Sequence, residues 1–86
     1  MRRRSFSEWK TTLMNRLIRL YSELEGEEKA QKDLDILITK LQYLKLRDLS
    51  SFLSLLHIVI KAHGLKELVN YLPTEEEIYG WFGRER

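Results

Sequence analysis

The chain has 86 residues, of which 43% are hydrophobic and 33% charged, and its formal net charge is +2; this composition is typical of one globular domain, residues 1–86, and excludes a disordered protein. Because the sequence contains no cysteine, it excludes disulfides and thiolate metal sites. No apolar run approaches the roughly 18 residues that a membrane-spanning helix needs, so we expect no contact with a membrane.

The N-terminal part of the chain predicts a basic arm, residues 1–6, that leads into an amphipathic helix. Ser5 stands three residues before Glu8, which is the spacing of a capping box, and Ser7 is a competing cap. Apolar side chains then recur at helical spacing on one face: Trp9, Leu13, Leu17, Leu20 and Leu24. This pattern predicts a helix that continues to about Gly26.

The helical period resumes over residues 27–48, with two apolar stripes instead of one. The main stripe consists of Ala30, Leu34, Leu37, Ile38, Leu41 and Leu44. Ile36 and Tyr43 lie on the opposite side, with Thr39 and Leu46 nearby. A helix with two apolar stripes is either enclosed within its own fold or presents the second stripe to another chain.

Residues 49–64 are apolar nearly all round, and only Ser50, Ser54, His57 and Lys61 form a narrow polar arc. The β-branched stretch "HIVI" leaves a buried strand as an alternative, but the length of the segment and a C-cap at Gly64 favour a helix. We expect this helix to be the central, most buried element. A short helix over residues 65–72, ended by Pro73, or a second subunit must then cover the rest of it.

Residues 74–86 form an aromatic C-terminal segment. Thr74 and Glu77 have the spacing of a second capping box, and Gly80 and Gly83 weaken the brief helix that would follow. On that helix Ile78, Trp81 and Phe82 share one face. Two interpretations stay open besides a disordered end: the segment folds back over its own core, or it anchors the chain to a partner.

These elements predict an all-α protein, a small bundle of four to five helices around the central helix 49–64, completed by dimerisation. A domain of this size has a thin margin of stability, so association is the expected supplement. The function we predict is a small interaction module that associates with itself, as a dimer first, or with another protein. The residues that we expect to bind the partner are Ile36, Tyr43, Ile78, Tyr79, Trp81 and Phe82.

The alternative function is nucleic-acid binding, as a dimeric regulator or as a subunit of a nucleoprotein complex. Basic residues concentrate in the first part of the chain, whereas acids follow them around Gly26. Phosphate contacts would come from Arg2, Arg3, Arg4, Lys10, Arg16 and Arg19. A helix-turn-helix fits poorly, because residues 65–72 offer few side chains that read base edges.

Catalysis finds little support in the sequence. His57 and His63 are six residues apart, so they cannot chelate one metal from the same helix face, and no glycine-rich phosphate loop occurs. We interpret His63 as a cap of the last helical turn and His57 as a structural polar residue. We therefore predict no enzyme, cofactor or metal. The arginines at the start precede no apolar signal segment, which predicts a cytoplasmic protein, and the abundant Lys, Glu and Arg resemble a thermophile's composition.

Overall fold

The computed structural model describes residues 3–84, and within them the predicted all-α fold is confirmed. The chain runs through α1 (Phe6–Glu23), α2 (Glu28–Gln42), the 3-10 turn η1 (Leu46–Asp48), α3 (Leu49–His63), the 3-10 helix η2 (Lys66–Tyr71) and α4 (Glu75–Arg84). No strand occurs in this part of the chain.

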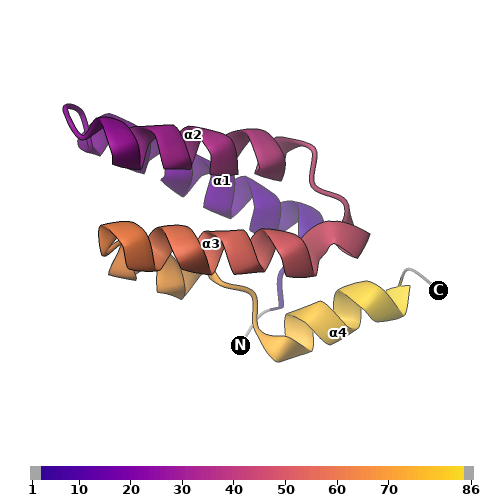
Figure 1. Cartoon of the computed structure of the whole chain (residues 1–86). Coiled ribbons are helices and arrows are strands. Elements are labelled where there is room, and N and C mark those ends of the chain that lie inside the picture. Colours follow the sequence, from indigo (N-terminus) through magenta and orange to yellow (C-terminus); the bar gives the residue numbers. More distant parts are fainter. Residues whose placement is uncertain (1–2, 85–86) are drawn as a thin grey trace.

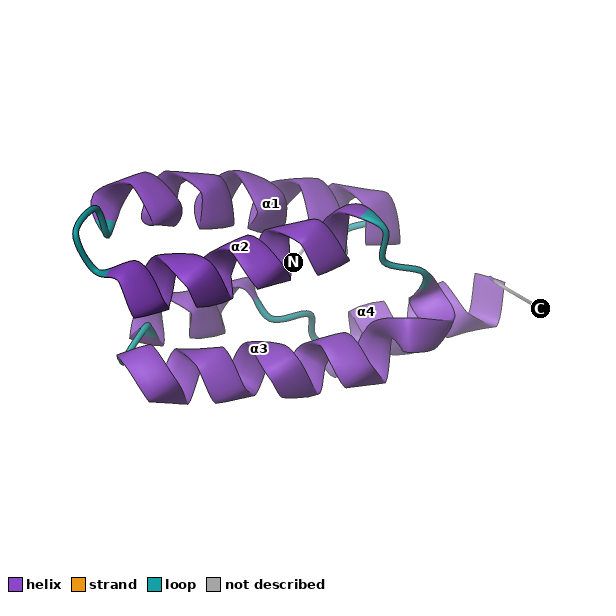
Figure 2. Cartoon of the chain, turned by 45° about the horizontal axis from the view of Figure 1, so that its top comes forward, coloured by secondary structure: helices purple, strands orange, loops and turns teal. Residues whose placement is uncertain are grey.

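The helix α2 packs against both α1 and α3, and η2 contacts both of these helices as well (Figures 1 and 2). The helix α4 lies beyond α3, beside the segment that precedes α1 (Figure 1). The expectation that α3 is the enclosed, central helix is not confirmed, since Ile58 in the middle of α3 is 64% exposed.

Local capping signals in the sequence are confirmed at three helix ends. The backbone N–H of Glu8 donates to Ser5 Oγ at 3.0 Å, and the N–H of Ser5 donates to a carboxylate oxygen of Glu8 at 3.0 Å. Thr74 and Glu77 make the same reciprocal pair at 3.0 and 3.1 Å. Gly64 ends α3 in the left-handed conformation, with φ of 62°, which a glycine adopts without steric cost.

Two predicted helices are shorter or tighter than expected. The helix predicted over residues 27–48 ends at Gln42, because Leu44 and Leu46 are both buried. Residues two apart on a helix point about 200° from each other, so a continuous helix would expose one of the two leucines. The helix predicted over residues 65–72 is the 3-10 helix η2.

The core joins leucines of the first three helices to an aromatic cluster that includes Trp81 of α4. The Trp81 ring lies 5.3 Å from the ring of Phe6 and 5.5 Å from that of Trp9, and only 3% of its surface is exposed. The indole N–H groups of both tryptophans donate hydrogen bonds to backbone carbonyls, Trp9 to Tyr71 and Trp81 to Arg4, each at 2.8 Å. Trp81 therefore folds back over its own chain, as the first interpretation of the aromatic segment expected.

Candidate functional site

The structure divides the six predicted partner-binding residues between two places. Ile36 lies on α2 and Tyr43 is the C-cap residue that follows it, with exposed fractions of 41% and 76%. On α4, Tyr79 and Phe82 are exposed, whereas Ile78 is partly buried against the core and Trp81 is enclosed. Trp81 is thus not accessible as a surface anchor, and the exposed members of the set are Ile36 and Tyr43 on the α2 side and Tyr79 and Phe82 on α4.

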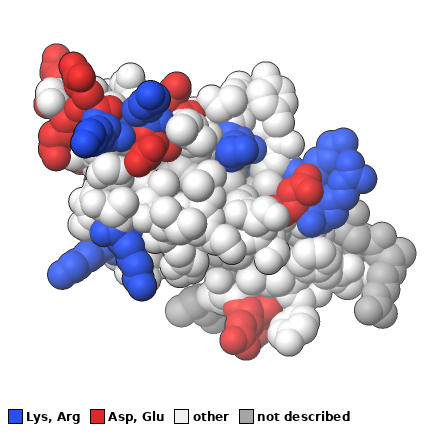
Figure 3. Space-filling view, viewed as in Figure 1, with Lys and Arg blue, Asp and Glu red and all other residues white. Residues whose placement is uncertain are grey.

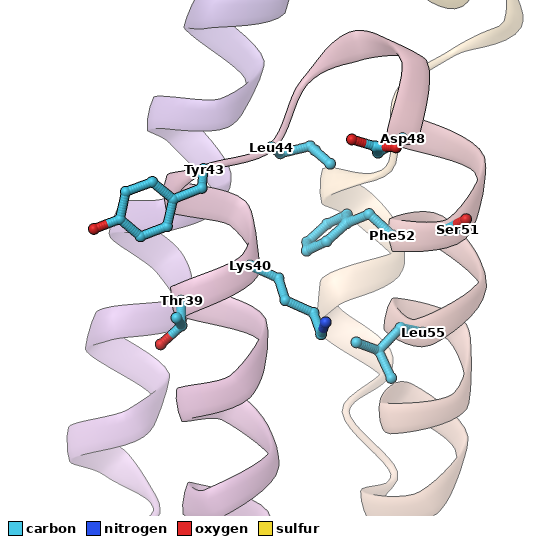
Figure 4. Close-up of a pocket in the computed structure, with 8 residues that line it drawn as sticks. All are labelled: Thr39, Lys40, Tyr43, Leu44, Asp48, Ser51, Phe52 and Leu55. Atoms are coloured by element: carbon cyan, nitrogen blue, oxygen red, sulfur yellow. The ribbon is translucent and has the colours of Figure 1, made fainter.

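A groove of about 670 Å³ opens between α2 and α3. It is lined by Thr39, Lys40, Tyr43, Leu44, Asp48, Ser51, Phe52 and Leu55. Figure 4 shows Phe52 and Leu55 projecting from α3 toward α2, while Lys40 extends from α2 into the space between the two helices. The side chain of Tyr43 points away from the groove on the α2 side (Figure 4). The groove therefore has an apolar interior beside an aromatic side chain that does not fill it.

The exposed side of α3 continues this surface. At about 100° per residue, Ser51, Leu55 and Ile58 lie within an arc of about 60°. Ile36, Thr39 and Lys40 of α2, with Tyr43 at its C-cap, lie within an arc of about 100°. We call these seven residues together the α2–α3 face: Ile36, Thr39, Lys40, Tyr43, Ser51, Leu55 and Ile58. The α3 half of this face was not predicted, because a helix that is apolar nearly all round was expected to be enclosed.

Most charge lies at the margins of this surface. In the space-filling view, most acidic and basic side chains gather toward the two ends, and a basic side chain stands in the largely uncharged area between them (Figure 3). Of the side chains that line the groove, Lys40 and Asp48 carry charge. Neither forms an ion pair within residues 3–84, and they are not paired with each other.

Two of the predicted phosphate-binding arginines form ion pairs inside the chain. Arg4 pairs with Glu77, with Nε to Oε2 at 2.9 Å, and Arg16 pairs with Glu23 and Glu67. The hydrogen bond from Arg4 lowers the pKa of Glu77 to about 2 and raises the pKa of Arg4. These two arginines are therefore occupied by intramolecular ion pairs.

The other predicted basic residues differ in their surroundings. The ammonium group of Lys10 donates to the Leu44 carbonyl at 2.9 Å and lies 5.3 Å from the centre of the Phe6 ring. Arg3 and Arg19 are exposed, and Arg2 lies outside the described residues. The predicted group is therefore not one continuous set of available cations.

The two histidines lie in different surroundings. His63 Nε2 lies 2.7 Å from Asp33 Oδ2, so it connects α3 to α2 instead of capping its own helix. His57 is exposed and lines a hollow of about 360 Å³ with Ile78 and Phe82. Among residues 3–84, no group of three or more side chains is placed to hold a metal ion.

No helix in the described part of the chain has both the length and the apolar character to span a bilayer. No protein-family model, curated protein or solved structure matches this chain. The fold defines its class as a small all-α protein. A function is therefore inferred from the surfaces of the molecule.

Proposed function

We propose that this protein is a small intracellular interaction module that associates with itself, as a dimer, through the α2–α3 face. The observation that carries the proposal is the exposure of Tyr43, which lines the groove, and of Ile36 and Ile58 on the two helices that form it. Exposed apolar surface that is rimmed by polar residues is typical of sites of protein–protein interaction.

The composition of the face supports protein binding in particular. The centres of protein interfaces are depleted of charge and enriched in aromatic residues, and a tyrosine that enters a pocket of the partner is a common hot spot. Tyr43 is the most exposed aromatic side chain on this face, at 76%. Most charges lie toward the margins of the face, as in the polar rim of an interface, and Lys40 is the charged side chain that lines the groove from α2 (Figures 3 and 4).

The aromatic segment supports a partner site less than the α2–α3 face does. Its largest side chain, Trp81, already stabilises the chain's own core. Tyr79 and Phe82 remain exposed on α4, and the hollow beside Phe82 is smaller than the groove between α2 and α3. We therefore assign the main contact to the α2–α3 face.

The solution molar mass tests this proposal. We expect size-exclusion chromatography with light scattering to give a dimer at both low and high salt, because apolar burial is not weakened by salt. Ile58→Ala should shift the protein toward the monomer. Ile18→Ala is the matched control, since Ile18 is 51% exposed on α1 and does not belong to the face. A monomer at every concentration would overturn the proposal.

Nucleic-acid binding is the second candidate function, and one observation supports keeping it. Arg3 and Arg19 are exposed and form no ion pair within the described part of the chain. Against it, Arg4 and Arg16 would have to leave their carboxylate partners before they could contact phosphates. This candidate therefore ranks below self-association.

A further inference from the structure

We infer that the occupant of the groove is a second copy of the chain, related by a two-fold axis, and that Lys40 of each copy pairs with Asp48 of the other. This inference rests on the proposed self-association and specifies its geometry. It is carried by two opposite charges in one groove that have no partner within the described residues.

Two opposite charges lie in the groove. Lys40 and Asp48 are both exposed and both line it. Asp48 occupies the N-cap position of α3, yet its side chain makes no capping hydrogen bond. Covering an apolar groove with a partner removes water from the charges at its margin, which is costly unless each charge finds an opposite charge. The occupant must therefore present both a carboxylate and an ammonium group.

A two-fold axis would make the contact symmetric. In a two-fold interface the same patch contacts itself, so a contact from Lys40 to Asp48 of the second copy occurs twice with the same geometry. Another protein would need an acid and a base at a matching separation. A second copy of this chain carries that spacing automatically, which makes it the occupant that the charges favour.

The interior of the groove is apolar. When the two-fold axis passes through the groove, Leu44, Phe52 and Leu55 of one copy face the same side chains of the other. These residues give the contact a central apolar region, and the two charge pairs flank it. Such pairs fix the register and orientation of the copies more than they add affinity.

The two-fold contact would also cover the exposed ring of Tyr43. A two-fold rotation about the groove exchanges the α2 side with the α3 side. Because Tyr43 points outward on the α2 side (Figure 4), its ring then lies over α3 of the second copy. Because α2 and α3 are antiparallel, Tyr43 is level with the start of α3, and Ile36, seven residues earlier, is level with Ile58, which is 64% exposed. The same geometry therefore gives these exposed side chains a place in the interface.

Charge reversal tests the pairing with the full chain. We expect Lys40→Asp alone and Asp48→Lys alone each to raise the dimer dissociation constant about a hundredfold, about tenfold for each of two like-charge contacts. An equimolar mixture of the two variants should form a heterodimer, because one chain then carries acids at both positions and the other carries bases. Its dissociation constant should return to within about tenfold of the wild-type value.

The readout is sedimentation equilibrium of each variant alone and of the mixture, with circular dichroism to verify that each variant is folded. Tyr43→Ala is a second variant that needs no charge reversal, and it should also weaken the dimer about tenfold or more. If the wild type is a dimer but neither charge reversal nor Tyr43→Ala changes its dissociation constant, this geometry is wrong while self-association stands. If the wild type is a monomer throughout, both proposals fail.

Discussion

Arg4 holds Glu77 in a bidentate ion pair, although 73 residues separate them in the sequence. The guanidinium donates from Nε to Oε2 and from Nη2 to Oε1, both at 2.9 Å, and the backbone N–H of Arg4 adds a third bond at 2.9 Å. Glu77 is only 3% exposed, so these bonds replace the water that its carboxylate loses. The pair fastens α4 to the segment that precedes α1.

The Arg4–Glu77 pair makes the stability of the fold depend on pH in the acidic range. The pKa of Glu77 is lowered from 4.5 to about 2, chiefly by the hydrogen bond from Arg4. A group with a lowered native pKa stabilises the fold above its unfolded pKa, and this contribution is lost as the pH falls from about 4.5 to about 2. We expect Glu77→Gln to lower the free energy of unfolding at pH 7 by about 2 to 3 kcal/mol.

Urea unfolding measured between pH 2 and pH 7 checks this effect. The difference between wild type and Glu77→Gln should stay constant above about pH 4.5 and shrink toward pH 2, because only the wild type has this carboxylate to protonate. Glu76→Gln is the matched control, since Glu76 is an exposed neighbour on the same helix. A difference that does not change with pH would mean that the ion pair is not its source.

The sequence could predict the local part of this arrangement and not the distant part. The capping box of Thr74 and Glu77 is readable because both residues lie within one helical turn. The partner of Glu77 across the fold is not readable, since any of the exposed-looking arginines could have served. Arg4 was therefore predicted to be a phosphate contact, and the same carboxylate was taken only as part of a helix start.

The surfaces of α3 show a second limit of sequence reasoning. Periodicity identified the helix and its Gly64 cap, but a segment that is apolar nearly all round does not reveal which side packs. That choice depends on the position of α2, and α2 is shorter than expected because Leu44 and Leu46 both turn inward. The groove arises from this tertiary arrangement, and only Tyr43 and Ile36 among its surroundings could be named beforehand.

Trp81 and Phe82 are adjacent, and we expect unequal losses of stability when each is truncated. Trp81→Ala should lower the free energy of unfolding by about 3 to 5 kcal/mol, because it leaves a cavity beside Phe6 and Trp9. Phe82→Ala should lower it by less than about 1 kcal/mol, because that ring is 44% exposed. Thermal unfolding followed by circular dichroism distinguishes the two. Equal losses would contradict the enclosed position of Trp81.

Gly64 and Gly83 both have room for a side chain, but only Gly64 has a backbone conformation that a side chain would strain. A Cβ atom placed on either residue meets no atom within 4 Å, so neither substitution by alanine creates a clash. Gly64 has a φ of 62°, and Gly64→Ala should cost about 1 to 2 kcal/mol of stability from conformation alone. Gly83 lies in α4, and Gly83→Ala should stabilise the protein by up to about 1 kcal/mol. Chemical denaturation gives both values, and a loss at Gly83 would contradict its helical conformation.

Binding to a nucleic acid separates the two candidate functions. Since Arg4 and Arg16 are held in ion pairs, we expect a duplex oligonucleotide to bind with a dissociation constant of about 10⁻⁴ to 10⁻⁶ M at physiological salt, the range of non-specific attraction. Fluorescence anisotropy over a range of salt concentrations measures both the affinity and its salt slope.

A nanomolar affinity with a steep salt slope would favour the nucleic-acid candidate, and two variants would then locate the contact. Arg19→Ala should flatten the slope by about one unit, because Arg19 is exposed and forms no ion pair within the described chain. Arg4→Ala should leave the slope unchanged and lower the unfolding temperature instead, because its guanidinium is committed to Glu77. If Arg4→Ala flattened the slope as much as Arg19→Ala, the ion pair would have to open on binding, and α4 would then be a movable element and not a fixed part of the core.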